Sequence, residues 1–149
     1  MEEQEFKQAY REVNPHPCPF EKAILSYRCG CEKHQRVFIA EREGVACRTQ
    51  SAHAVCQQVH AQLQKNAQFA LKLPDLTQPL PHAKAMKLQC GGLVGLQNSL
   101  PDIPPESMHE VDNIYALIRD AIQMYQTIAQ FPYAQIVKFI VHYQVRRHK

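Results

Sequence analysis

The chain has 149 residues, of which 45% are apolar and 21% charged, a balance typical of a globular protein and unlike that of a disordered or collagen-like chain. Its formal net charge of +3 is too small to indicate nucleic-acid binding by itself. There is no apolar run of the roughly 18 residues that a membrane-spanning helix needs, and the acidic N-terminus is unlike a secretory signal. We therefore expect a single helical domain over residues 1–149, cytoplasmic and without a membrane partner.

The beginning of the chain is predicted to place two short helices around a stiff linker. Apolar residues spaced by three and four indicate an amphipathic helix over residues 3–13. A second short helix is expected over residues 20–27, with Pro19 at its first turn. The linker, residues 14–19, holds three prolines at alternate positions, which bias it toward an extended conformation. Cys18 should therefore lie on a rigid extended segment.

The next stretch, residues 32–45, is ambiguous. Its apolar run, residues 37–40, suits either a helical turn or a short strand. The charged run at residues 41–43 favours a helix, and Gly44 favours the end of that helix. We therefore expect helix here and an all-α fold.

A longer helix should follow, ending near Lys72 and capped at its start by Thr49 or Ser51. Its apolar positions keep a helical period over five turns. They are Ala52, Val55, Cys56, Val59, Leu63, Ala67 and Ala70.

Two proline-bearing connectors, residues 73–82 and 98–106, are expected in the second half of the chain. Residues 83–88 should add one or two helical turns between them. Three of the five glycines fall within residues 91–95, but the segment lacks the spacing of phosphate-binding loops. A turn that breaks the helix and packs against the bundle is the expected structure there.

The chain should end in two amphipathic helices. A capping box at Ser107–Glu110 predicts the start of the first, which should stop near Phe131, before a proline. The last helix is expected from Tyr133 to about Arg146. Together these elements predict a small all-α bundle with a cysteine-rich region, residues 14–56, in its N-terminal part.

The six cysteines are the most informative feature of the sequence. Five of them fall between residues 18 and 56, and the sixth is Cys90. A cytoplasmic chain keeps thiols reduced, so such a cluster indicates a metal site or redox chemistry rather than disulfides. The pair Cys29 and Cys31 is tighter than the spacing usual for zinc, and no second pair follows.

One tight pair with scattered single cysteines suits an iron–sulfur cluster, because a cluster is larger than one ion and takes ligands from distant segments. We expect a [4Fe–4S] cluster in preference to [2Fe–2S], with an electron-transfer or redox-sensing role. The expected ligands are Cys18, Cys29, Cys31 and Cys47. Cys56 is the first substitute, although its position on an apolar helix face also suits a buried hydrophobic residue. Cys90 and His34 are further substitutes.

Two alternatives remain open from the sequence alone. A zinc ion held by Cys29, Cys31 and His34 with one more cysteine would make a zinc-stapled module that contacts protein or nucleic acid. Six unrelated buried thiols would instead belong to a metal-free helical scaffold. No convincing acid–base or nucleophile constellation indicates an enzyme.

Charge around the cysteines suggests a partner. Basic residues such as Arg28, Lys33 and Arg48 surround the cysteine segment, which favours an acidic redox protein over nucleic acid. The sequence says nothing about the oligomeric state.

Overall fold

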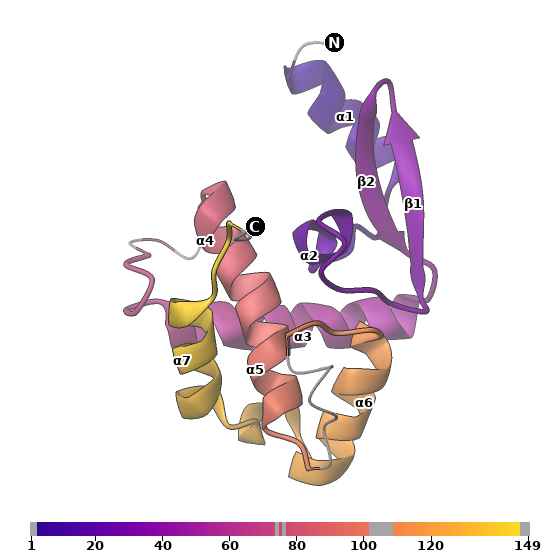
Figure 1. Cartoon of the computed structure of the whole chain (residues 1–149). Helices are drawn as coiled ribbons and strands as arrows, with labels where there is room; N and C mark the ends of the chain where they lie inside the picture. Colours follow the sequence, from indigo (N-terminus) through magenta and orange to yellow (C-terminus); the bar gives the residue numbers. More distant parts are fainter. Residues whose placement is uncertain (1–2, 74, 76, 102–108, 147–149) are drawn as a thin grey trace.

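Two antiparallel strands interrupt the helices, so the predicted all-α fold is wrong and the protein is mixed α/β (Figure 1). The computed structural model describes residues 3–73, 75, 77–101 and 109–146. It is 56% helical and 11% strand. Strand β1 (His34–Ile39) pairs with β2 (Arg42–Cys47), and the register sets His34 opposite Cys47.

The hairpin lies where the sequence favoured a helix, and tertiary contacts explain the difference. Val45 is fully buried, and Arg36 pairs with Glu43 across the two strands at 2.5 Å. The turn passes through Ala40, which has a positive φ of 57°. Tight hairpin turns are normally marked by Asn-Gly or Asp-Gly, so this alanine leaves no sequence signal for the turn.

The helices of the first half lie where they were predicted, and the second and third of them are shorter than expected. Helix α1 (Glu3–Val13) has the predicted bounds, and α2 (Glu21–Leu25) is shorter than expected. Helix α3 (Gln50–Ala67) begins after Thr49, whose side chain makes no capping hydrogen bond, and stops before the predicted end.

The glycine-rich segment is helical, which corrects the predicted turn. Helix α4 (His82–Met86), the π-helical turn η1 (Lys87–Gly91) and α5 (Gly92–Asn98) follow one another without a break. A Cβ atom on Gly91 would lie 2.7 Å from Cα of Ile140, so glycine is needed for close packing of this helix on α7 (Tyr133–His142).

The last helices are shorter than predicted. Helix α6 (Ile114–Tyr125) begins after Asn113, and a 3-10 turn, η3 (Ile128–Gln130), follows it. Residues 107 and 108 of the expected capping box lie outside the described residues, as do residues 102–106 of the second connector. Helix α7 ends at His142 rather than near residue 146.

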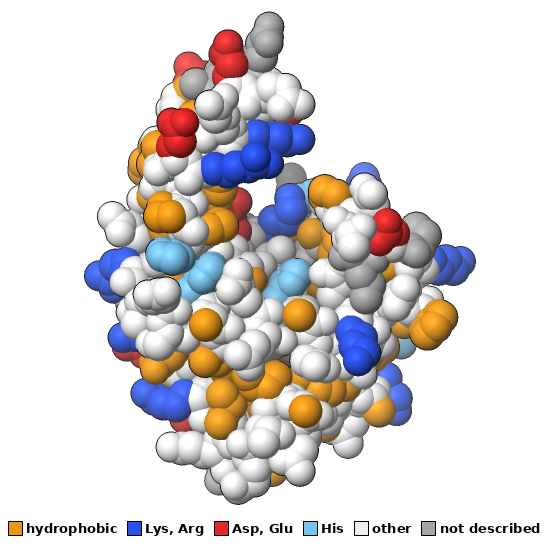
Figure 2. All heavy atoms as spheres, turned by 180° about the vertical axis from the view of Figure 1, so that it is seen from behind, with side chains coloured by type: hydrophobic (Ala, Val, Ile, Leu, Met, Phe, Trp, Pro, Cys, Tyr) orange, Lys and Arg blue, Asp and Glu red, His pale blue; other side chains and the backbone are white. Residues whose placement is uncertain are grey.

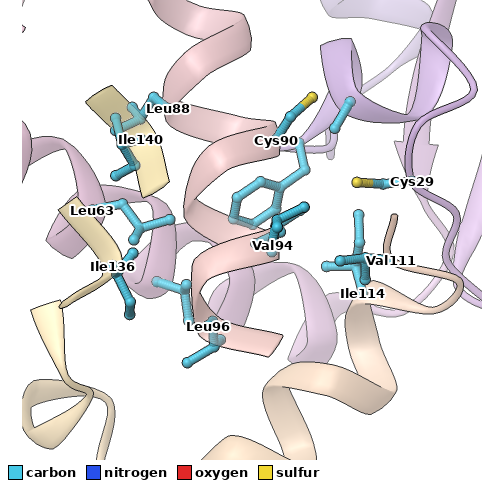
Figure 3. Close-up of a cluster of buried hydrophobic side chains, with 14 of the residues drawn as sticks. Cys29, Leu63, Leu88, Cys90, Val94, Leu96, Val111, Ile114, Ile136 and Ile140 are labelled. Atoms are coloured by element: carbon cyan, nitrogen blue, oxygen red, sulfur yellow. The ribbon is translucent and has the colours of Figure 1, made fainter. Parts of the chain in front are cut away.

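The hydrophobic core lies among α2, α3, α5, α6 and α7. The arm formed by α1 and the hairpin (residues 3–13 and 34–47) extends away from the helices α3, α5, α6 and α7 (Figure 1). Figure 3 shows the part of this core that α5, α6 and α7 build with the loop at Cys29. No helix in the described part of the chain is long and apolar enough to cross a membrane. The largest fully buried side chains of the hydrophobic core are Phe20, Ile24, Val45, Val59, Leu88, Leu93, Leu96, Val111, Ile114, Ile118, Ile136 and Ile140.

Candidate functional site

The extended segment before α2 runs beside β2 and brings Cys18 to Cys47. The Cys18 N–H donates to the Val45 carbonyl at 2.9 Å, and the Cys47 N–H donates to the His16 carbonyl at 2.9 Å. These bonds make an isolated antiparallel bridge between Pro17 and Ala46. The predicted stiff segment therefore lies along β2 and is joined to it by one isolated bridge.

The register of the hairpin brings Cys31 to the same place. Cys31 lies three residues before His34, which pairs with Cys47. The His34 N–H donates to the Cys31 carbonyl at 3.2 Å, and the Arg48 N–H donates to the Lys33 carbonyl at 2.8 Å. The loop that carries Cys31 is thus closed against the end of β2.

Helix α3 supplies the fourth cysteine, Cys56. A hydrogen bond of 2.9 Å between Nε2 of His53 and the Pro17 carbonyl ties this helix to the segment that carries Cys18. The rings of His16 and His53 lie 5.2 Å apart, centroid to centroid. Because Cys56 is one turn beyond His53, this contact turns the Cys56 side of the helix toward the other three cysteines.

Cys18, Cys31, Cys47 and Cys56 line one small pocket, which we call the cysteine pocket. Ile114 and Tyr115 at the start of α6 complete its wall, and the Lys33 ammonium lies 5.2 Å from the centroid of the Tyr115 ring. The free volume is about 10 Å³, room for about one water molecule, so thiol side chains fill the space between the segments.

The pocket does not have the geometry of a site for one ion. Among the described residues, no three His, Cys, Asp or Glu side chains are grouped closely enough to hold a single metal ion. The donor set of four thiols is nevertheless the one that soft metals and iron–sulfur clusters prefer. His34 also lines the pocket, but its Nδ1 is within hydrogen-bonding distance of the Cys31 carbonyl.

Burial controls the charge of these thiols. It raises the pKa of both Cys18 and Cys56 to about 12, and the other cysteines of the pocket add to this effect. These two side chains are therefore neutral thiols at neutral pH when no metal is present. A thiol must lose its proton to ligate a metal, so metal uptake here would release protons.

Cys29 lies apart from the cysteine pocket, although it is only two residues from Cys31. It is buried in the core beside Cys90 (Figure 3), and a hydrogen bond between the two thiols raises the pKa of Cys29 and lowers that of Cys90. Tyr143 and the positive charge of Arg28 lower the pKa of Cys90 further. The sequence analysis placed Cys29 and Cys31 in one ligand set, and the structure separates them.

The loop around Gly30 explains this separation. The Gly30 N–H donates to the Val111 carbonyl at 2.9 Å, and the Ile114 N–H donates to the Gly30 carbonyl at 2.8 Å. A Cβ atom on Gly30 would lie 2.8 Å from the Asp112 carbonyl oxygen. Glycine thus permits a close backbone contact that anchors the loop between Cys29 and Cys31.

The structure brings together three of the four cysteines preferred from the sequence, and adds Cys56 in place of Cys29. Sequence reasoning missed Ile114 and Tyr115, because they belong to a helix more than 50 residues beyond the last cysteine of the pocket. Comparison of the chain with protein-family models, curated proteins and solved structures found no match. Function must therefore be argued from the site itself.

Proposed function

We propose that the chain binds a [4Fe–4S] cluster through Cys18, Cys31, Cys47 and Cys56 and has an electron-transfer or redox-sensing role. The observation that supports it most is the meeting of four thiols from four separate segments at one pocket. Hydrogen bonds that do not involve the sulfur atoms hold these segments together. The thiols are therefore positioned by the fold rather than by a metal.

Spacing favours a cluster over zinc. Tetrahedral zinc holds its sulfurs at about 2.3 Å, which brings the sulfurs within about 3.8 Å of one another. No such tight group occurs among the described side chains. A cluster spreads its ligands over several iron atoms, so it accepts more widely spaced thiols. The free space between the thiols is only about 10 Å³, so the four segments would have to move apart to admit a cluster.

The test is reconstitution of the purified chain with ferrous iron and sulfide under anaerobic conditions. We expect about four iron and four sulfide ions per chain and a brown colour that dithionite bleaches. A colourless protein that holds one zinc per chain would reject the cluster in favour of a zinc-stapled module. Absence of any metal, with all thiols slow to react until the chain is unfolded, would reject both and leave a metal-free scaffold.

The partner that we propose is an acidic redox protein that docks beside Cys18. A groove of about 710 Å³ between the arm and α2 includes Cys18 in its wall. Figure 2 shows, from behind, the hollow between the arm and the rest of the molecule, with Lys and Arg side chains at its margins. The basic side chains that line the groove are Lys7, Arg11, Lys22 and Arg42.

In the described part of the chain, two acidic side chains line this groove, and both form contacts within the fold. Glu21 accepts a hydrogen bond from the Val45 N–H at 2.9 Å and another from the Tyr10 hydroxyl. Glu43 pairs with Arg36. Of the basic side chains, Arg42 pairs with Glu3 at 3.0 Å. Lys7, Arg11 and Lys22 still outnumber the unneutralised Glu21 in the described lining, so the groove presents net positive charge, which steers an acidic protein toward it.

Ferricyanide, a small anion that takes one electron from the reduced cluster, tests this charge. Its rate of reduction by the loaded protein should fall several-fold as salt rises from about 10 to 200 mM, because screening weakens long-range attraction. K7Q and R11Q should slow the reaction at low salt, whereas K65Q, on α3, should not. A rate independent of both salt and K7Q would contradict docking at this groove.

A further inference from the structure

A second pocket lies between α5, α7 and the segment that leads into α6. Its volume is about 830 Å³, within the range of small-molecule sites. From its lining, we propose that this pocket, which we call the Arg28 pocket, binds a small organic anion that carries a carboxylate or phosphate on an apolar body. The proposal does not depend on a metal in the cysteine pocket.

The anchor of the site is Arg28. Only 9% of its surface is exposed. Its Nη2 donates to the Val145 carbonyl, and its guanidinium lies 5.5 Å from the centroid of the Tyr143 ring. Its Nη1 is buried and has no hydrogen-bond partner among the described residues. The guanidinium also interacts with the Cys90 thiol. An anion in the pocket would place a further negative charge beside this cation, which is stabilising for a positive charge that is largely removed from water.

The other charges of the pocket agree with an anionic ligand. His109, His142 and Arg146 line it together with Arg28, and all three are exposed. Among the described residues of this lining, Glu110 is the single acidic side chain. An arginine guanidinium matches the planar geometry of a carboxylate or phosphate, and histidine N–H groups add donors.

The remaining wall holds the amides Asn98 and Gln144 and an apolar part, and this apolar part argues for more than a bare inorganic ion. Val94 from α5 and Phe139 from α7 line the pocket beside the Tyr143 ring. Phe139 is 39% exposed despite its size. A ligand with an aromatic or aliphatic body would cover this surface while its anionic group meets Arg28.

The Arg28 pocket and the cysteine pocket share one structural support. The Val111 N–H donates to the Arg28 carbonyl at 3.4 Å, in the same pairing of segments that anchors Gly30. Arg28 lies at one end of this loop, and Cys31 lies at the other. An anion at Arg28 would therefore bind beside the support of the cysteine pocket without contacting its thiols.

The experiment is titration of the full chain, before and after metal loading, with phenyl phosphate, benzoate and inorganic phosphate. Calorimetry measures the affinity of the chain for each anion. Changes in amide chemical shifts identify the residues at which the anion binds. Phenyl phosphate should bind about tenfold more tightly than inorganic phosphate, because its ring adds apolar burial. Comparison with benzoate tells a phosphate site from a carboxylate site. Shift changes should centre on Val94, His142 and Tyr143.

Variants give the controls. R28Q should weaken phenyl phosphate binding by more than about tenfold, because it removes the largely buried positive charge beside the anion. If R28Q fails to fold, R146Q and H142Q at the pocket rim should each weaken binding severalfold, whereas R119Q on exposed α6 surface should not. Absence of binding by all three probes, or equal affinity in R146Q and R119Q, would overturn the proposal.

Discussion

Replacement of Cys56 by serine is expected to lower the iron content of the reconstituted protein by more than about tenfold. Loss of a group that merely supports a ligand costs about 10–100-fold in metal affinity, and loss of a ligand should cost at least as much. C29A, by contrast, should leave iron content and the charge-transfer absorbance unchanged. Iron analysis and visible spectra of both variants, purified side by side, make the comparison.

This pair of variants distinguishes the ligand set expected from cysteine spacing from the ligand set that the structure supports. Spacing favoured Cys29 as a ligand and Cys56 as its substitute, whereas the fold places Cys56 at the cysteine pocket and Cys29 beside Cys90. Far-ultraviolet circular dichroism must show that both variants fold. Normal iron content in folded C56S, or loss of iron from folded C29A, would reject the proposed ligand set.

Substitution of Gly91 by alanine is expected to destabilise the protein by about 3 kcal/mol, the upper part of the range for overpacking. The new Cβ atom would lie 2.7 Å from Cα of Ile140 and 2.9 Å from the Phe139 carbonyl oxygen. Both are backbone atoms of α7, so relief requires the two helices to move apart. For a chain of about this length the change should lower Tm by roughly 6–12 °C.

Gly92 provides a matched control in the next position of the same helix. A Cβ atom there meets the methyl end of the Leu63 side chain at 2.8 Å, and that end can rotate away. Alanine also favours helix over glycine by about 1 kcal/mol, so G92A should change stability by less than about 1 kcal/mol. Urea unfolding of both variants measures the difference. Equal effects would contradict the tight contact of η1 with α7.

The elements that could be predicted from sequence are those whose pattern is local. Helix α1 follows from apolar residues spaced by three and four, and it has the bounds that the pattern predicts. The interior of α3 follows in the same way from Ala52 to Ala67. The ends of the helices were less accurate, because the caps rest on loop contacts that the pattern does not contain.

The hairpin and the glycine-rich helix were predicted wrongly because contacts between distant segments stabilise them. The stability of β1 and β2 depends on contacts with α1, α2 and the extended segment at Pro17, none of which is encoded within residues 34–47. Glycines at 91, 92 and 95 normally weaken a helix, but here they let α7 and α3 approach closely. Packing across the molecule thus outweighs local preference in both places.

By itself the sequence determined the helical periods, the stiffness of the Cys18 segment and the supply of six thiols, five of them between residues 18 and 56. Only the tertiary structure decided which thiols meet. The Cys18 segment forms hydrogen bonds with β2, and the loop that carries Cys31 forms them with the end of that strand. The His53 side chain joins α3 to the Pro17 carbonyl by another hydrogen bond. These are hydrogen bonds between segments up to 36 residues apart, which spacing along the chain cannot reveal.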